Sequence, residues 1–190
     1  MIEFSAMFYI GLSIFGVIGL LRGWVREVQV TAATVLAMFI IEQGSPWVLQ
    51  VLVDRTPADS LAIDPIGTLR RLVVLKVSIL LIIVFFGYQG PVVLSFASQG
   101  RIKANRARET VQEGILGLGA GLLNGYLVVG AIWWYLHLGQ YPFEWMISPL
   151  NFPDSASAGL ITLLPLRFLI SPWLEILVVV FFLIVLVVVI

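Results

Sequence analysis

Long uncharged runs of apolar residues constrain this sequence more than any other feature. Residues 4–21 form the first run, and a transmembrane helix needs about 20 mostly apolar residues, with about 17–25 as the usual range. Four later stretches are similar, although Lys76 interrupts one of them. The sequence therefore predicts an all-α fold, a single polytopic membrane domain over residues 1–190. Its five transmembrane helices are expected at about 4–21, 28–45, 72–98, 114–137 and 173–190.

The composition excludes the soluble classes of protein. Hydrophobic residues make up 60% of the 190 residues and charged residues 12%, whereas soluble domains carry about 45–50% and about 25%. The formal net charge is zero, so nothing in the overall charge attracts a nucleic acid. The sequence has no cysteine and one histidine, and its Ser, Asp and Glu residues form no nucleophile–base pattern. We expect a membrane protein that is not an enzyme and binds no cofactor.

Basic residues in the short loops predict the orientation in the membrane. Lys and Arg concentrate in cytoplasmic loops, and Arg22 and Arg26 lie in the first loop. The N-terminus is therefore expected outside and the C-terminus in the cytoplasm, although Arg70 and Arg71 in the second loop favour the opposite. The third loop holds the densest basic group, which either binds anionic lipid headgroups or only sets the topology. Its members are Arg101, Lys103, Arg106 and Arg108.

The segments between the apolar runs carry weaker signals. The second loop, which contains Pro46, is expected to be irregular and to end in a short interfacial helix over residues 61–75. Thr110 and Glu113 fit a capping box, which predicts that a helix begins with Thr110 as its N-cap. The fourth loop is rich in proline and aromatic residues and is expected to lie on the membrane. Within it, residues 156–170 are either re-entrant or interfacial.

Glycines at a spacing of four predict a helix-packing face in the fourth span. Glycine allows helix backbones to approach closely in a membrane, where packing replaces the hydrophobic effect. We expect this face to pack within the protomer or between protomers, with two glycines of the first span as its counterpart. Asn124 in the same span is expected either to join helices by hydrogen bonds or to line a polar pathway. The glycines are Gly117, Gly121 and Gly125, with Gly16 and Gly19 opposite.

Two further polar residues have open roles. Lys76 either extends its amine to the membrane surface or pairs with Glu42 inside the bundle. His137 follows an aromatic run at the end of the fourth span, and we interpret it as an interfacial residue rather than a metal ligand.

The first loop is predicted to be a rigid cytoplasmic hairpin. Arg22 and Arg26 are four residues apart and would share one face of a helix. Gly23 between them allows a tight reversal. The arginines are expected to meet lipid phosphate or the acids Glu109 and Glu113, and the alternative is that they only set the topology.

The same loop carries a recognisable motif, Gly19-Leu20-Leu21-Arg22-Gly23-Trp24-Val25-Arg26-Glu27. It resembles the bacterial colicin V production protein family, CvpA, whose members have G-x-x-R-G-aromatic-x-x-E between their first two spans. A second motif of that family, an acid followed by glycines every four residues, is similar to Glu113 with the glycine face. Asn124 stands where an arginine is common in the family, and the segment 176–190 looks like an addition to the four usual spans.

The resemblance implies a protein of the bacterial inner membrane that takes part in colicin or toxin production, secretion or envelope homeostasis. We expect it to contact the lipid bilayer and to act as a homo-oligomer or with a membrane-complex partner, and not with nucleic acid. The alternative is a small accessory subunit of a larger respiratory or photosynthetic complex. A transporter is a third class, for which Lys76 is the candidate intramembrane charge.

Overall fold

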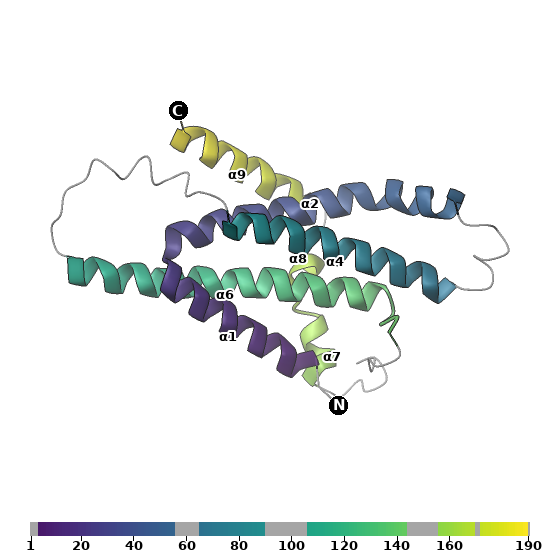
Figure 1. The fold of residues 1–190 in the computed structure, drawn as a ribbon, viewed down its shortest axis with the longest axis horizontal. Coiled ribbons are helices and arrows are strands. Elements are labelled where there is room, and N and C mark those ends of the chain that lie inside the picture. Colours follow the sequence, from purple (N-terminus) through teal and green to yellow (C-terminus); the bar gives the residue numbers. More distant parts are fainter. Residues whose placement is uncertain (1–3, 56–64, 90–105, 144–155, 170–171, 190) are drawn as a thin grey trace.

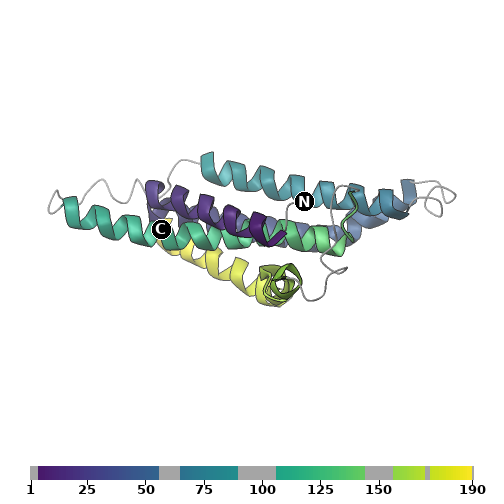
Figure 2. The same ribbon diagram turned by 90° about the horizontal axis from the view of Figure 1, so that it is seen from below.

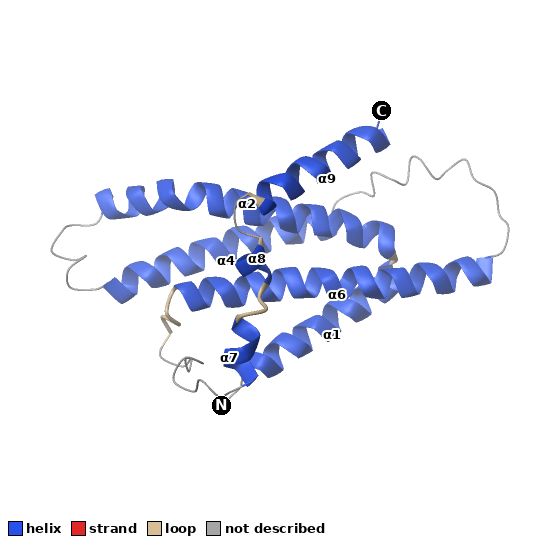
Figure 3. Ribbon diagram, turned by 180° about the vertical axis from the view of Figure 1, so that it is seen from behind, coloured by secondary structure: helices blue, strands red, loops and turns tan. Residues whose placement is uncertain are grey.

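The computed structural model describes residues 4–55, 65–89, 106–143, 156–169 and 172–189. Every regular element among these residues is a helix, and no strand occurs in them (Figure 3). The all-α prediction is therefore confirmed. The helices are α1 (Phe4–Arg22), α2 (Trp24–Arg55), α4 (Pro65–Gln89), α6 (Arg106–Leu138), α7 (Ala156–Ile161), α8 (Pro165–Phe168) and α9 (Trp173–Val189).

Three stretches of helix are long and apolar enough to cross a membrane, judged by length and composition. They are Phe4–Arg22, Trp24–Val51 and Val111–Leu138. Each has at least 18 residues, and at 1.5 Å per residue such a helix covers most of the roughly 30 Å of a bilayer core. The chain is therefore a membrane-embedded protein, while the predicted number of five spans stays a prediction.

α2, α4 and α6 run along the length of the molecule, and α1 crosses α6 obliquely (Figure 1). α1 packs most extensively on α6, whereas α2 lies against both α4 and α6. α9 also contacts α2 and runs obliquely away from it toward the C-terminus (Figures 1 and 2). The chain order thus brings the first and fourth predicted spans together, although nearly 100 residues separate their closest points.

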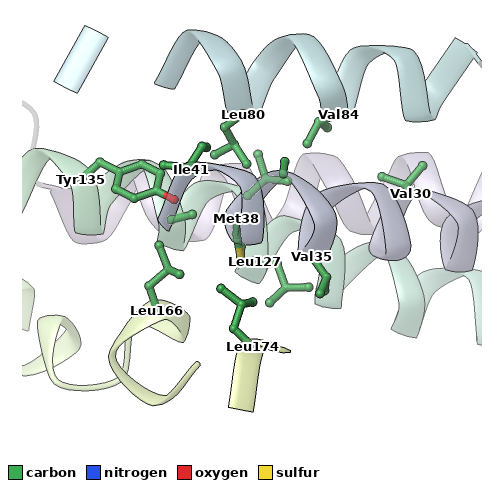
Figure 4. Packing of buried hydrophobic residues seen from close by; sticks show 13 residues of the cluster. Val30, Val35, Met38, Ile41, Leu80, Val84, Leu127, Tyr135, Leu166 and Leu174 are labelled. Carbon is green, nitrogen blue, oxygen red and sulfur yellow. The ribbon is translucent and has the colours of Figure 1, made fainter. Parts of the chain in front are cut away.

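The main core lies where α2, α4 and α6 meet (Figure 4). Met38 and Leu80 are completely buried there, and Leu127 is 5% exposed. Leu166 and Leu174 close the same cluster from α8 and α9. On the outer faces of the bundle many large apolar side chains are exposed, as lipid-facing positions require.

Three expectations about the helix ends are wrong. Pro46 lies inside α2, which continues to Arg55 instead of ending in an irregular loop. The Ser45 hydroxyl, just before the proline, donates to the carbonyl of Ile41 one turn earlier at 2.5 Å. α4 runs unbroken from Pro65 to Gln89, so the described part of residues 61–75 belongs to the same helix as the predicted third span, while residues 61–64 lie outside the described residues. α6 begins at Arg106, which places Thr110 inside the helix and not at its N-cap.

The two short helices pack against the bundle. The amide N of Ser5 donates to Ser157 Oγ of α7 at 3.2 Å, and the Tyr126 hydroxyl donates to the carbonyl of Leu163 at 2.6 Å. The Pro165 ring of α8 lies against Gly130 of α6, where a Cβ would collide with it. The described part of residues 156–170 is thus held by α1 and α6. A cavity of about 320 Å³ lies between α2, α6, α8 and α9, and its lining is almost entirely apolar.

Candidate functional site

The turn between α1 and α2 positions the candidate site. Gly23 alone separates the two helices, and its φ of 84° lies in the left-handed region that favours glycine. Its amide N donates to the carbonyl of Gly19 at 2.9 Å, which ends α1. The tight reversal predicted for Gly23 is therefore confirmed. It places Arg22 at the end of α1 and Glu27 in the first turn of α2, close enough to meet.

Glycines from α1 and α6 form the crossing that supports this turn. A Cβ on Gly19 would collide with the carbonyl oxygen of Gly117 and would lie 2.7 Å from the Cα of Gly121. A Cβ on Gly125 would lie 2.9 Å from the Cβ of Phe15, and Gly16 faces Leu122 in the same way. The backbones therefore touch, and the glycine face lies inside the protomer.

Glu27 is the centre of a buried polar cluster, which we call the Glu27 cluster: Arg22, Glu27, Thr31, Tyr88 and Asn124. The Glu27 side chain is completely buried. Its Oε1 accepts from Arg22 Nη1 at 3.2 Å, and its Oε2 accepts from Asn124 Nδ2 at 2.8 Å and from the Tyr88 hydroxyl at 3.2 Å. Four helices thus contribute to the surroundings of one carboxylate.

Asn124 uses both ends of its amide in the cluster. Its Nδ2 also donates to the backbone carbonyl of Glu27 at 2.9 Å, while its Oδ1 accepts from the Thr31 hydroxyl at 2.7 Å. Asn124 is 0% exposed and Thr31 7% exposed. Asn124 therefore joins α6 to α2 by hydrogen bonds, one of the two roles that the sequence left open.

Arg22 is held from two further directions. Its Nη2 donates to the backbone carbonyl of Tyr88 at 2.8 Å, and its guanidinium carbon lies 4.5 Å from the centroid of the Tyr88 ring. A cation over an aromatic face at this distance is attracted to it. Its side chain keeps 24% exposure, against 0% for Glu27. The cation thus stands at the rim of the cluster and the anion inside it.

Electrostatics make this cluster the best functional candidate among the described residues. An ionisable residue within a membrane helix is costly to bury and occurs mainly where it is paired and used. Arg22 and Glu27 form an ion pair. Each acceptor oxygen of Glu27 has a donor, so the charge is neutralised in place.

The sequence prediction for the two arginines is partly wrong. Arg22 meets Glu27 and not Glu113, which is exposed, while the side chain of Glu109 lies outside the described residues. Arg26 is exposed and makes no contact in the cluster, so its expected contact with lipid phosphate stays a prediction. Arg101 and Lys103 lie outside the described residues, and Arg106 and Arg108 belong to the first turn of α6.

Two members of the cluster had not been predicted. Tyr88 lies near the end of α4, where its sequence neighbours Gly87 and Gln89 give no sign of a partner 61 residues away. Thr31 stands four residues after Glu27, and its single hydroxyl proton is shared between the Glu27 backbone carbonyl at 3.0 Å and Asn124 Oδ1 at 2.7 Å. An acid, a threonine and an asparagine within apolar helices are the signal that could have pointed to this group, because each needs a polar partner in a membrane.

His137 lies at the far end of α6 from the Glu27 cluster. Its Nδ1 is 3.4 Å from the Tyr141 hydroxyl, which accepts from Trp133 Nε1 at 3.2 Å. No group of three or more His, Cys, Asp or Glu residues that could hold a metal ion occurs within the described ranges. Burial raises the pKa of the Tyr141 phenol, and the hydrogen bond from Trp133 opposes this rise. His137 therefore belongs to an aromatic group at the end of a helix.

Comparison with known proteins adds no relative. No family model, no curated protein and no solved structure matches the chain.

Proposed function

We propose that this chain is a CvpA-like protein of the bacterial inner membrane that supports colicin or toxin production, secretion or envelope homeostasis without enzymatic activity. One observation carries the proposal. The two motifs on which the resemblance rests are far apart in the sequence, yet their residues meet, because Gly19 of the first motif packs on Gly117 and Gly121 of the second. Two motifs that form one site in the structure support a relation to the family better than two motifs that lie far apart in it.

In this proposal the Glu27 cluster holds the helices together at the cytoplasmic end of the bundle. It ties the α1–α2 turn to α4 through Tyr88 and to α6 through Asn124. The proposal keeps five membrane segments, with the N-terminus outside and the C-terminus in the cytoplasm. Oligomer or partner contacts would use the exposed apolar faces, because the glycine face is already occupied by α1.

Complementation in the native host tests the proposal. A strain without this chain should lose toxin release or envelope integrity, and the natural sequence should restore it. Glu27→Leu should not restore it, because Arg22, Tyr88 and Asn124 then lose their common acceptor. Gly119→Ala is the matched control, since nothing lies within 4 Å of a Cβ there. Full restoration by Glu27→Leu at a normal level in the membrane would contradict the proposed role of the cluster.

The accessory-subunit alternative predicts a different purification result. Large side chains such as Trp47 and Trp173 are 69% and 63% exposed, and they would suit lipid or a neighbouring subunit equally well. Affinity purification in mild detergent separates the two functions. Self-association into one discrete species supports the CvpA-like protein, whereas recovery in a fixed ratio with a large respiratory or photosynthetic complex supports the subunit.

A further inference from the structure

A second polar group lies along the bundle from the Glu27 cluster. It consists of Glu42 on α2, Lys76 on α4 and Tyr135 on α6. The Lys76 amine lies 5.2 Å from the centroid of the Tyr135 ring. Glu42 acts electrostatically on both Lys76 and Tyr135. Three helices thus bring an acid, a base and a phenol together within a membrane protein.

These groups are close, but their hydrogen-bonding capacity is not used. Tyr135 is 1% exposed, and neither its hydroxyl nor Glu42 Oε1 has a hydrogen-bond partner among the described residues. Lys76 and Glu42 do not form a direct ion pair there. Leaving one such buried group unpaired costs about 1–3 kcal/mol, and more for a charged group. Native structures rarely leave buried polar groups without a partner from the protein or from ordered water.

The surroundings have room for a small bridging group. A cavity of about 40 Å³ is lined by Lys76 and Tyr135, with Val73, Leu138 and Gly139 around them. One water molecule needs about 10–15 Å³ of such volume and two to four polar partners. Figure 4 shows the Tyr135 hydroxyl directed toward Ile41, the residue before Glu42 on α2.

We propose that this group is a hydration site in which water molecules bridge the Lys76 amine, the Tyr135 hydroxyl and the Glu42 carboxylate. Water fits because it both donates and accepts: it can donate to Glu42 Oε1, accept from Lys76, and do either with the phenol. An anion such as chloride fits less well, because the Glu42 carboxylate would repel it. The site is independent of the function proposed above, since it shares no residue with the Glu27 cluster.

The hydration is confined to one end of the bundle. Glu27 and Glu42 lie on the same helix, 15 residues or about 22 Å apart. Met38 and Leu80, both 0% exposed, and Leu127, 5% exposed, fill the core between them. Water would therefore enter beside Leu138 and Gly139 at the end of α6 and stop at this apolar layer.

Hydroxyl-radical footprinting of the purified chain in nanodiscs tests the site directly. Radicals formed from bound water oxidise the side chains that it touches, even when these are buried. Tyr141 is the matched control, because it is also a buried tyrosine, 6% exposed, whose hydroxyl already accepts from Trp133. We expect Tyr135 to be oxidised about fivefold faster than Tyr141. Exposure alone predicts the reverse order, so an equal or slower rate at Tyr135 would overturn the proposal.

A pair of variants gives the second measurement. Lys76→Met removes one partner of the water, and the oxidation of Tyr135 should fall about threefold while that of Tyr141 is unchanged. Arg71→Met is the control, because Arg71 is exposed on the same helix. An unchanged Tyr135 rate in folded Lys76→Met contradicts the bridging role of Lys76. The comparison within the natural sequence decides the proposal even if this variant does not fold.

Discussion

The ion pair in the Glu27 cluster should respond very unequally to the loss of its two partners. Arg22→Gln removes the cation and leaves a carboxylate that is 0% exposed. Glu27→Gln removes the anion and leaves a guanidinium that is 24% exposed and still donates to the Tyr88 carbonyl. The stranded arginine can reach water, whereas the stranded carboxylate cannot. The first substitution should therefore destabilise the protein more.

The magnitudes follow from the partners that remain. Removing one member of a buried pair costs about 3–5 kcal/mol. Asn124 and Tyr88 still donate to Glu27 in Arg22→Gln, so we expect the lower end, about 3 kcal/mol. Glu27→Gln keeps an acceptor oxygen for these donors and should cost about 1 kcal/mol. The double variant should cost about as much as Glu27→Gln alone, which corresponds to a coupling of about 2–3 kcal/mol.

Reversible unfolding in mixed micelles, with linear extrapolation to zero denaturant, measures these free energies of unfolding. Arg26→Gln is the control, because Arg26 is exposed and four residues from Arg22, and its cost should stay within about 0.5 kcal/mol. The reasoning is refuted if the costs of Arg22→Gln and Glu27→Gln simply add in the double variant. It is also refuted if Arg22→Gln costs no more than Arg26→Gln.

Two other predictions concern backbone packing and pH. Gly19→Ala should destabilise the protein by at least about 2 kcal/mol, because the new Cβ would collide with the Gly117 carbonyl oxygen. Gly119→Ala should be neutral or slightly stabilising, because nothing lies within 4 Å of a Cβ there. The unfolding assay described above measures both variants. Burial raises the pKa of Tyr141 in the folded protein. The stabilisation that its protonated phenol contributes is therefore complete below the pKa of an unfolded tyrosine, about 10, and is lost as the pH rises through the higher pKa of the folded state. Stability measured between pH 8 and about 12 should therefore fall more steeply in the natural chain than in Tyr141→Phe, and equal slopes would contradict this.

The sequence predicted the helices of this fold better than the contacts between them. Apolar runs and glycine spacing depend on neighbouring residues, so the long helices and the packing face of α6 were found without a structure. Helix ends were less accessible, because α2 continues past Pro46, a residue that usually ends a helix, and because α6 begins with the polar residues 106–113 before its apolar run. Composition marks where a span ends, but not where a helix ends.

The same holds for the candidate site, where the sequence indicated several of the residues but not which of them meet. Asn124 was singled out as a buried amide, yet its partner Glu27 is 97 residues away, and nothing in the order of residues connects them. Arg22 and Glu27 are five residues apart on different helices, so helical spacing pointed away from their contact. Gly23 bends the chain between them, and only the direction of that bend decides which side chains meet.

The long separation between α1 and α6 has a consequence for the order in which the protein assembles during synthesis. Residue 124 leaves the ribosome about 5–20 s after residue 27, at about 5–20 residues per second. Throughout that interval the glycine surface of α1 and the amide-binding side of Glu27 lack their partners from α6. Arg22, five residues before Glu27 and its ion-pair partner in the folded protein, is already made and can pair with the acid as the hairpin enters the bilayer. The nascent hairpin thus carries its own counter-ion before the helix that completes it exists.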